Sequence, residues 1–495
     1  MQLPAAIRID RRDSVAIALR GIAADEIVTI DGEQVRTIEA IARGHKFALS
    51  PIEAGAPVLK FGFPIGIALA PIASGAHVHT HNVTTALSGT ATEISAVAGD
   101  QAGTAAAAPH FLGYRRPDGR VATRNEIWIL PTVGCVARTA EKIAATARDR
   151  HAGRIDGVHA FAHPFGCSQL GADLEATRAI LAGLAQNPNA GGVLILGLGC
   201  ESNQMAELVE LIPPDRRGHI RTLAAQGVED EVAAGLALID ELVAIAGEAQ
   251  RESLPLADIV LGVKCGGSDG FSGLTANPLV GRVSDAVTRG GGTAILTEIP
   301  EIFGAEHLLV ARAADGQVAD FILGLVDRFK RYFIAYGEPV SENPSPGNIA
   351  GGITTLEEKS LGAVQKAGHA IVTDVIDYGG HAHRPGLTLL EAPGNDAVSS
   401  TALAAAGATA ILFTTGRGTP LGFPVPTIKI ASNSDLANRK AHWIDFDAGP
   451  ALTRGLDAMA TDLIARLAVI ASGEPTAAER NDEREIAIWK RGVTL

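Results

Sequence analysis

The four cysteines have the most distinctive chemistry in this chain of 495 residues. Each of them follows an apolar run that predicts a β-strand; they are Cys135, Cys167, Cys200 and Cys265. Because ligands bind at the carboxyl ends of parallel strands, we expect all four thiols to face one rim and to bind a metal or a cluster. The alternative is that they pack in the core, as unpaired cysteines often do. No Cys-x-x-Cys pair occurs, which argues against a zinc knuckle or a ferredoxin-type cluster.

Three histidines alternate with other residues in the segment 77–82. In an extended strand, residues two apart share a face, so His77, His79 and His81 would project together. Imidazole is a good ligand for iron, zinc and manganese. A polar surface strand is the alternative interpretation. The segment therefore predicts a second set of metal ligands, carried to the rim by the first part of the chain.

The loop that follows Cys265 is dense in Gly, Ser, Thr, Asp and Asn up to residue 278. Its backbone N–H groups and short polar side chains, including Ser268, Asp269 and Asn277, suit a carboxylate or a polyol. The loop contains neither the nucleotide P-loop nor the dinucleotide-binding pattern. We therefore expect it to bind an anionic polyol, with an ordinary flexible loop as the alternative.

Two further segments carry candidate site residues. Arg417 lies between two glycines, where a guanidinium could grip a carboxylate, and Thr419 follows it. An arginine solvated on a turn is the alternative. His163 precedes the Cys167 loop and is a candidate general base or acid, although a histidine at such a position is often structural.

The elements that must position these residues fall into two kinds. Short strands separated by turns, such as the one at Asp31–Gly32, predict a small β domain over residues 1–90. An Ala- and Gly-rich stretch over 91–110 predicts a linker. Strand–loop–helix units then predict two α/β subdomains with parallel sheets, over 111–257 and 258–495.

Length and composition limit the class of protein. A chain of 495 residues is too long for one hydrophobic core, and its 46% hydrophobic residues suit a folded protein. A net charge of −13 argues against general nucleic-acid binding. We find no signal peptide and no apolar run that could span a membrane. We therefore expect a cytoplasmic protein with reduced thiols, and its size and class would suit a homodimer.

Taken together, these motifs resemble the altronate dehydratase family of sugar-acid dehydratases over nearly the whole chain. The matching stretches are residues 43–49, 77–82, 124–135, 197–201, 265–269, 343–348, 415–420 and 442–447. One difference is Leu421, where we expect an altronate enzyme to carry Tyr. The galactarate branch lacks the three-histidine segment, so the resemblance favours altronate.

The resemblance implies a SAF-type (β-clip) domain at the N-terminus, joined to a two-part α/β catalytic region. It also implies a lyase of hexuronate degradation that uses Fe(2+) or Mn(2+). Such a hydro-lyase removes water from a 2,3-dihydroxy acid and leaves a 2-keto-3-deoxy acid. Galactarate dehydratase, sulfolactate sulfo-lyase and a non-catalytic sugar-acid binding protein are the alternatives.

The elimination needs a base for the C2 proton, an acid for the C3 hydroxyl and stabilisation of the enediolate. We assign proton transfer to His77 or His163. Carboxylate and substrate binding is assigned to Arg417, Thr419, Asn277 and the Ser268–Asp269 loop, with Asp269 also a catalytic candidate. Metal binding is assigned to His79, His81, Cys135, Cys167, Cys200 and Cys265. Three thiolates could instead hold an iron–sulfur cluster with one open iron, and the sequence leaves both possibilities open.

Overall fold

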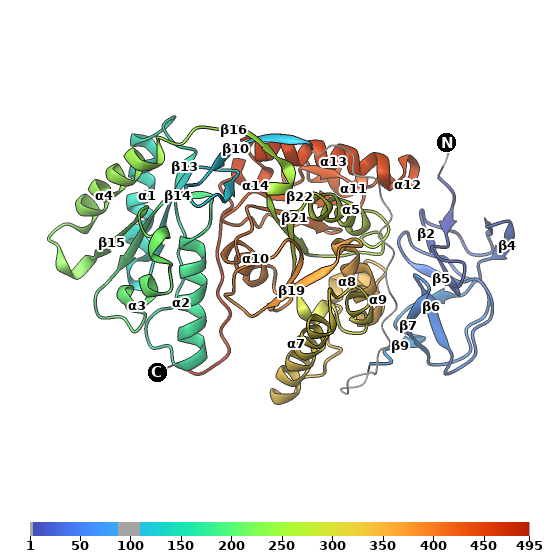
Figure 1. Ribbon diagram of the computed structural model, residues 1–495. Coiled ribbons are helices and arrows are strands. Elements are labelled where there is room, and N and C mark those ends of the chain that lie inside the picture. The colour runs from blue at the N-terminus through green and yellow to red at the C-terminus, as the bar shows by residue number, and fades with distance from the viewer. Residues whose placement is uncertain (1–2, 88–108, 495) are drawn as a thin grey trace.

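The computed structural model describes residues 3–87 and 109–494. Figure 1 shows a small β domain at one end, an α/β domain at the other end and a larger α/β domain between them. The fold class expected from the sequence is thereby confirmed. Most of the linker predicted over 91–110 lies outside the described residues. Within the described residues, no helix is both long enough and apolar enough to cross a membrane.

The N-terminal domain is built from three small antiparallel sheets. Its strands are β1 (Ala6–Ile7), β2 (Val15–Ala18), β3 (Ile27–Ile30), β4 (Glu33–Arg36), β5 (Lys46–Ala48), β6 (Pro57–Lys60), β7 (Phe63–Ala68), β8 (His77–Val78) and β9 (Val83–Thr84). They pair in the orders β1-β2-β5-β8, β3-β4 and β6-β7-β9. The β3–β4 hairpin turns at Asp31 and Gly32, whose φ angles of 52° and 88° are those of a two-residue hairpin turn.

The middle domain is a parallel sheet with helices on both faces. Its strand order is β13 (Gly157–Ala160), β12 (Glu126–Pro131), β14 (Ala190–Gly197) and β15 (Ile220–Ala224). The helices are α1 (Ala137–Arg150), α2 (Gly171–Ala185), α3 (Met205–Glu210) and α4 (Glu231–Ala246). A three-stranded antiparallel sheet, β11 (Val121–Ala122), β10 (His110–Arg115) and β16 (Glu252–Pro255), links it to the rest of the molecule.

The C-terminal domain contains a seven-stranded parallel sheet. Its order is β19 (Val372–Ile376), β20 (Gly386–Leu390), β18 (Thr293–Leu296), β17 (Val260–Cys265), β21 (Ala410–Thr415), β22 (Thr427–Ala431) and β23 (Phe446–Asp447). The chain leaves β17 toward β18 on one side and later returns to β21 on its other side. Ligands of open α/β sheets bind at such a reversal, outside the carboxyl ends of the strands. Cys265 ends β17 and therefore marks the expected crevice.

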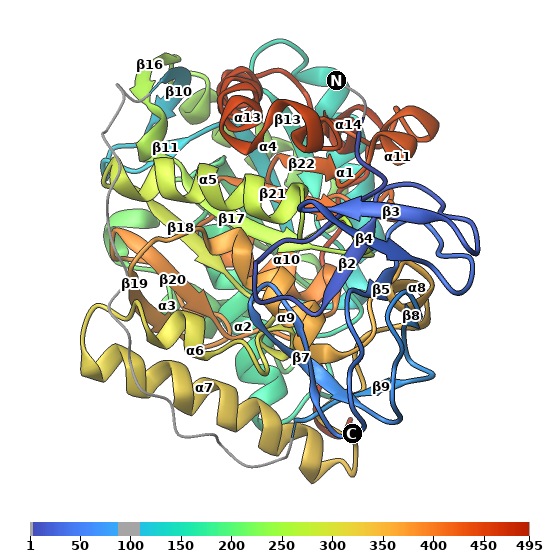
Figure 2. The same ribbon diagram turned by 90° about the vertical axis from the view of Figure 1, so that its right-hand side faces the viewer.

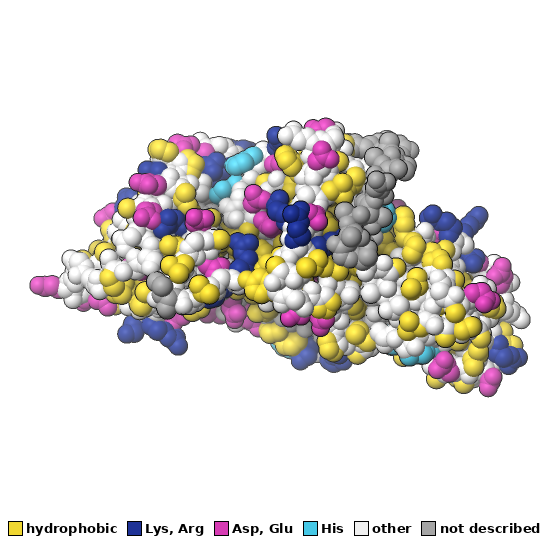
Figure 3. Space-filling view, turned by 90° about the horizontal axis from the view of Figure 1, so that it is seen from below, with side chains coloured by type: hydrophobic (Ala, Val, Ile, Leu, Met, Phe, Trp, Pro, Cys, Tyr) yellow, Lys and Arg dark blue, Asp and Glu magenta, His cyan; other side chains and the backbone are white. Residues whose placement is uncertain are grey.

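Helices cover the sheet of the C-terminal domain. They are α5 (Ala276–Arg289), α6 (His307–Val310), α7 (Gly316–Ala335), α8 (Pro346–Ala350), α9 (Leu356–Ala363), α10 (Asp396–Ala405), α11 (Ser434–Arg439), α12 (Ala451–Arg454), α13 (Leu456–Ala471) and α14 (Ala477–Arg480). Helix α10 packs on α2 of the middle domain, and the two domains share one hydrophobic core. Seen from below, charged side chains of both signs are interspersed with apolar ones (Figure 3).

The N-terminal domain is docked firmly against the C-terminal domain. Its apolar residues Val58 and Ile65 belong to the same buried core as Leu361 of α9. Lys46 and Lys60 donate hydrogen bonds of 2.8 and 2.7 Å to the Glu358 carboxylate, and all three side chains are buried. Figure 2 shows β5 and β7 lying beside α8 and α9. The first domain therefore completes the surface of the third.

Two expectations from the sequence are wrong at this level. The four cysteines do not share one rim, because Cys135, Cys167 and Cys200 follow strands of the middle sheet and Cys265 ends a strand of the other sheet. The segment 77–82 is not one extended strand either. β8 ends at Val78, and the backbone then turns so that the Asn82 N–H donates to the His79 carbonyl oxygen.

Candidate active site

Cys265 lies in a cluster of buried charged side chains at the end of β17. Lys366 Nζ lies 2.7 Å from its Sγ atom, and the Cys265 N–H donates to Glu298 Oε2 at 3.0 Å. The Cys265 thiol also faces Glu301 Oε2 at 3.3 Å. Lys264, the preceding residue, donates to Glu298 and to Asp396. Residues from four separate segments therefore converge on one thiol.

The charges of this cluster fix the protonation of its members. Burial, helped by the Glu298 carboxylate, raises the pKa of Cys265 to about 12, so the thiol is protonated at pH 7. Burial alone would raise the pKa of Glu301, but Lys359, Lys366 and Lys264 outweigh it and lower this pKa to about 2. Burial would likewise lower the pKa of Lys359, but the Glu301 carboxylate outweighs it and the pKa is raised. Glu301 and Lys359 therefore form a buried ion pair, 2.8 Å apart.

A cavity of about 810 Å³ opens beside this cluster. Its polar lining residues are Cys265, Ser268, Glu301, Glu342, Asn343, Ser345, Asn348, Lys359 and Asp396, and its apolar wall includes Phe329, Tyr332, Phe333 and Trp489. Lys359 Nζ also donates to Asn343 Oδ1 at 2.9 Å and to Asn348 Oδ1 at 3.2 Å. The ammonium group is thus held in place before any ligand arrives. Alternating donors and acceptors of this kind suit a small polyhydroxy acid.

Four histidines lie together where the N-terminal domain meets α8. His45 Nδ1 and His77 Nε2 are 3.0 Å apart, and the rings of His77, His79 and His81 lie at 5.2 and 5.6 Å between centroids. Burial, with a smaller contribution from neighbouring cationic groups, lowers the pKa values of His77 and His79 to about 4. These imidazoles are therefore neutral at pH 7, the form that binds metals. His45 faces the Ala350 carbonyl oxygen of α8, whose residues Asn348 and Ile349 line the cavity.

The two clusters differ in how well they would suit a divalent metal. In the described part of the chain, Cys265, Glu298 and Glu301 are the one group of three His, Cys, Asp or Glu side chains whose ligand atoms all lie within 4.8 Å. Three lysines already neutralise the charge of these carboxylates, and the thiol is protonated. A metal cation would therefore bind weakly there. His77 and His79 are neutral, and the buried Nδ1 atom of His79 has no hydrogen-bond partner among the described residues. The donor chemistry of the histidine cluster therefore suits a metal ion better, and no three of its ring nitrogens lie within 4.8 Å of one another in this structure.

The residues predicted after Cys265 take different places. Ser268 lines the cavity. Asp269 is buried and accepts hydrogen bonds from Ser272, Ser432 and Asn433, so it fixes the loop and does not face the cavity. Asn277 is buried in α5, where it donates to the Gly362 carbonyl oxygen and accepts from Thr414. The structure thus brings only Ser268 of these three to the cavity.

Arg417, Thr419 and His163 lie outside the cavity as well. Arg417 is exposed, and its backbone N–H donates to the carbonyl oxygen of Gly267, which lines the cavity. Thr419 accepts a hydrogen bond from the Leu421 N–H. His163 is buried in the middle domain, where Nε2 contacts the Pro131 carbonyl oxygen at 2.8 Å and Nδ1 accepts from the Phe165 N–H. Both ring nitrogens of His163 are therefore committed to the backbone.

The interpretation of the sequence missed several residues of the site. His45 was not singled out, because it is an isolated histidine just before β5 and lies 32 residues before His77 in the sequence. Lys359, Lys366 and Glu301 carry no spacing signal, since they come from separate helices and loops. The one available signal was the placement of Lys264 beside Cys265 at the end of an apolar strand.

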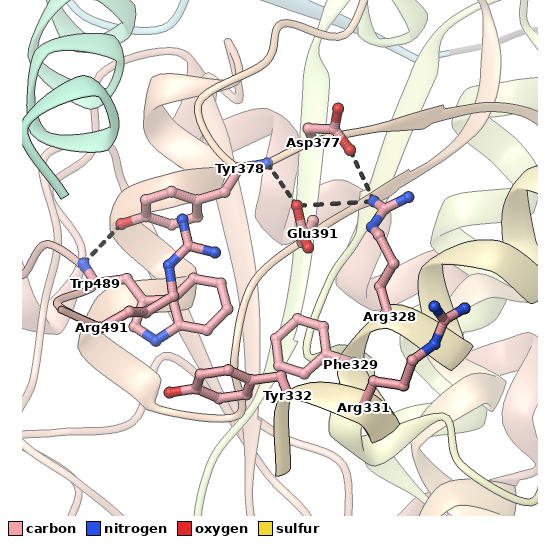
Figure 4. A pocket seen from close by; sticks show the side chains of 9 residues that line it. All are labelled: Arg328, Phe329, Arg331, Tyr332, Asp377, Tyr378, Glu391, Trp489 and Arg491. Carbon is pink, nitrogen blue, oxygen red and sulfur yellow. Dashed lines mark hydrogen bonds and ion pairs between the residues drawn. The ribbon is translucent and has the colours of Figure 1, made fainter. Parts of the chain in front are cut away.

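A second hollow of about 670 Å³ adjoins the cavity and shares the wall formed by Phe329, Tyr332 and Trp489. Figure 4 shows Arg328 directed at Asp377 and Glu391, the nearer contact measuring 2.8 Å. The Trp489 N–H donates to the Tyr378 hydroxyl at 3.0 Å, which fixes the C-terminal segment beside the cavity. Three arginines line this hollow: Arg328 and Arg331 are paired with carboxylates, and Arg491 lies over the Trp489 ring at 4.4 Å.

Comparison with known proteins identifies the family. Three family models match consecutive parts of the chain: the altronate/galactarate dehydratase SAF domain over residues 4–86, the second domain of D-galactarate dehydratase/altronate hydrolase over 113–247, and the C-terminal D-galactarate/altronate dehydratase region over 256–494. The chain is 48% identical to altronate dehydratase of Escherichia coli K12 and 47% identical to that of Bacillus subtilis 168, each over 99% of both chains. This chain belongs to the altronate/galactarate dehydratase family.

Within the altronate/galactarate dehydratase family, the similarity is uneven. Galactarate dehydratase (L-threo-forming) of Escherichia coli K12 is 32% identical over 90% of this chain and 88% of its own length. The family resemblance expected from the sequence motifs is therefore confirmed, and the altronate branch is the more similar one.

Proposed function

We propose that this protein is a hydro-lyase that converts D-altronate to 2-keto-3-deoxy-D-gluconate and water. The observation that carries the proposal is the 48% and 47% identity to two altronate dehydratases over 99% of each chain. In the reaction the C2–H and C3–O bonds break, a C2=C3 double bond forms, and the resulting enol becomes the 2-keto acid. The C3 hydroxyl accepts a proton and leaves as water.

The cavity beside Cys265 is the proposed substrate site. Lys359, Asn343 and Ser345 offer donors and acceptors to the carboxylate and hydroxyl groups, and Ser268 lines the cavity as well. Arg417 adjoins the cavity at Gly267, and we retain it as the proposed clamp for the substrate carboxylate. His77, neutral at pH 7, remains our candidate for proton transfer; His163 has no ring nitrogen left for that role.

The metal proposal rests on the histidine cluster. His45, His79 and His81 would hold Fe(2+) or Mn(2+), because imidazole is a good ligand for both, and His77 lies beside them. A bound ion of this kind supplies Lewis acidity that stabilises charge developing on a carboxylate or an enediolate.

A direct assay tests the activity. Purified full-length protein is incubated with altronate, galactarate and sulfolactate, and the 2-keto-3-deoxy acid and sulfite are measured separately. Turnover of altronate well above the other two supports the proposal. Preference for galactarate or sulfolactate would move the protein to another branch of the family, and binding without turnover would favour a sugar-acid binding protein.

The metal site has its own test. His79→Ala should lower the Mn(2+) content of protein loaded with that ion at least ~tenfold, since removing a ligand costs no less than removing its outer partner. His442→Ala, at an exposed position outside the cluster, is the matched control and should keep its Mn(2+). Equal Mn(2+) content in the two variants would place the metal elsewhere.

The cellular setting follows from the same features. All four cysteines are unpaired, which supports a reducing compartment and hence the cytoplasm. The net charge of −13 supports a small-molecule substrate over a nucleic acid. We keep the homodimer as a proposal, which light scattering on the purified protein would test.

A further inference from the structure

Three cysteines of the middle domain lie at the same edge of its sheet. Cys167, Cys135 and Cys200 follow β13, β12 and β14, which are adjacent parallel strands in that order. Neighbouring strands are about 5 Å apart, so the outer two loops flank the central one within roughly 10 Å. All three thiols are exposed, whereas Cys265 is buried in the other domain. Burial in a core therefore does not account for these three residues.

Hydrogen bonds tie the three cysteine loops to one another. The Gly134 N–H donates to the Phe165 carbonyl oxygen at 2.9 Å, which joins the first loop to the second. The Asn203 N–H donates to the Gly166 carbonyl oxygen at 3.0 Å, and Asn203 Nδ2 donates to the Thr132 carbonyl oxygen at 3.1 Å. The third loop is thereby fastened to both others. The positions of the three thiols are fixed relative to one another by backbone contacts.

A glycine precedes each of the three cysteines. Gly166 and Gly199 have φ angles of 101° and 127°, which other residues rarely adopt. A Cβ atom on Gly166 would collide with the Thr132 carbonyl oxygen, and one on Gly134 would lie 3.1 Å from a backbone oxygen of the neighbouring loop. Gln226, which packs on Gly199, donates from Nε2 to the Cys200 sulfur at 3.6 Å. The loops are built to approach closely and to point thiols outward.

The spacing of the three thiols favours a cluster over a single metal ion. Their sulfur atoms do not all lie within 4.8 Å of one another. A cluster accommodates a wider spacing, because each thiolate binds a different iron atom. No disulfide joins any pair of them.

We propose that Cys135, Cys167 and Cys200 hold an iron–sulfur cluster in which one iron has no cysteine ligand. The proposal goes beyond the dehydratase activity and does not depend on which sugar acid is the substrate. When bound, such a cluster would offer an open coordination position on a solvent-facing iron. It would be a second metal centre in the middle domain, whereas the histidine cluster belongs to the N-terminal domain.

The C-terminal segment connects this edge with the cavity. Trp489 lies in the cavity wall, the N–H groups of Arg491 and Gly492 donate to the Asp173 carboxylate of α2, and Thr494 pairs with Gln169, two residues after Cys167. Five residues span at most about 17 Å, so the cysteine edge and the cavity wall are close along this segment.

Chemical analysis of the full-length protein tests the proposal. Protein purified without oxygen, or incubated with Fe(2+) and sulfide under thiol reductant, should contain acid-labile sulfide and at least as much iron, and should show sulfide-to-iron visible absorbance. Cys135→Ser, Cys167→Ser and Cys200→Ser should each lower the sulfide content and this absorbance at least ~tenfold. Cys265→Ser is the matched control and should retain both. Iron without sulfide in the wild type, or unchanged contents in the three serine variants, would overturn the proposal.

Alkylation provides a second readout that needs no variant. Iodoacetamide should modify the three exposed thiols in chelator-treated wild-type protein and leave them unmodified in the loaded protein, with Cys265 unreactive in both. Equal labelling before and after loading would contradict the cluster. Altronate turnover by wild-type protein that contains no sulfide would support the dehydratase proposal and contradict the cluster. A cluster in wild-type protein that is inactive on altronate would support the cluster and contradict the dehydratase proposal.

Discussion

At the scale of single residues, the lysines around Cys265 balance the negative charge of the carboxylates beside the cavity. Lys359 is 9% exposed at its side chain and compensates Glu301, which is 6% exposed. Removing an ammonium group from such a pair leaves a carboxylate buried without its counter-charge, which is costly. The same ammonium is the cation nearest to any acid bound in the cavity.

We expect Lys359→Met to lower kcat/KM by roughly 10- to 150-fold, because a charge-assisted hydrogen bond contributes about 1.5–3 kcal/mol. The measurement is kcat/KM for altronate together with the thermal midpoint. Lys142→Met, on the exposed face of α1, is the control and should match the wild type in both. Unchanged kcat/KM in Lys359→Met would show that the substrate lies elsewhere.

Arg417 makes a separate prediction at the same scale. It is exposed beside Gly267, and no ion pair involving it occurs among the described residues. If its guanidinium grips the substrate carboxylate, Arg417→Lys should reduce kcat/KM about tenfold or more while the thermal midpoint stays within about a degree, because a lysine loses the two-pronged geometry. A variant as active as the wild type would identify Arg417 as a solvated turn residue.

At the scale of elements, one buried carboxylate joins the first domain to the third. Glu358 on α9 accepts from Lys46 of β5 and Lys60 of β6, and Thr354 Oγ1 donates to it as well. Burial would raise the pKa of Glu358, but Lys46 and Lys60 outweigh it and hold this pKa well below its usual range. Burial lowers the pKa of Lys46 to about 8. The docking of β5 and β6 on α9 therefore depends on the charges of these three side chains.

Glu358→Gln should destabilise the protein by about 3–5 kcal/mol, because it leaves two buried ammonium groups without their counter-charge. Denaturant unfolding of the full-length protein measures the change. Glu53→Gln, an exposed carboxylate of the same N-terminal domain, should change stability by less than about 0.5 kcal/mol. A small effect at Glu358 would mean that the docking of the first domain rests on its apolar contacts alone.

At the scale of the whole molecule, an ion network holds the middle domain against the C-terminal end of the chain. Arg124 donates to Glu479 of α14 at 2.9 Å, and Arg484 donates to both Glu479 and Glu126. Burial would raise the pKa of Glu479, but Arg124 and Arg484 outweigh it and lower this pKa to about 2. The unfolded chain titrates near the usual value of 4.5.

This pKa shift predicts how stability depends on pH. A carboxyl group that binds its proton less readily in the folded protein stabilises it fully above about pH 4.5 and progressively less as pH falls toward about 2. The contribution of Glu479 is on the order of 3 kcal/mol. Glu479→Gln should therefore be less stable than the wild type at pH 7 and show a shallower loss of stability from pH 4.5 to 2. Parallel curves for the two proteins would contradict this.

The sequence by itself determined the fold class and the family. Strand–loop–helix units gave the parallel sheets, because apolar periodicity and glycine-rich loops act over a few neighbouring residues. The Gly–Cys loops and the histidine segment were visible in the sequence, and Ser268 lines the cavity. These signals are local, so they survive without knowledge of the tertiary structure.

Only the tertiary structure decided which of these features meet. Cys265 and Cys135 both follow an apolar strand but belong to different sheets, since sheet membership depends on the packing of distant strands. Asp269 and Asn277 look like binding residues in the loop sequence, yet long-range partners at Ser432 and Thr414 bury them. His45, Lys359 and Lys366 joined the site only because the domains dock, with α9 packed on β7 and the turn at Val364–Ala367 packed on β17. The shared hydrophobic core brings together residues that lie about 300 positions apart, such as His45 and Ala350. No local spacing in the sequence encodes such a contact.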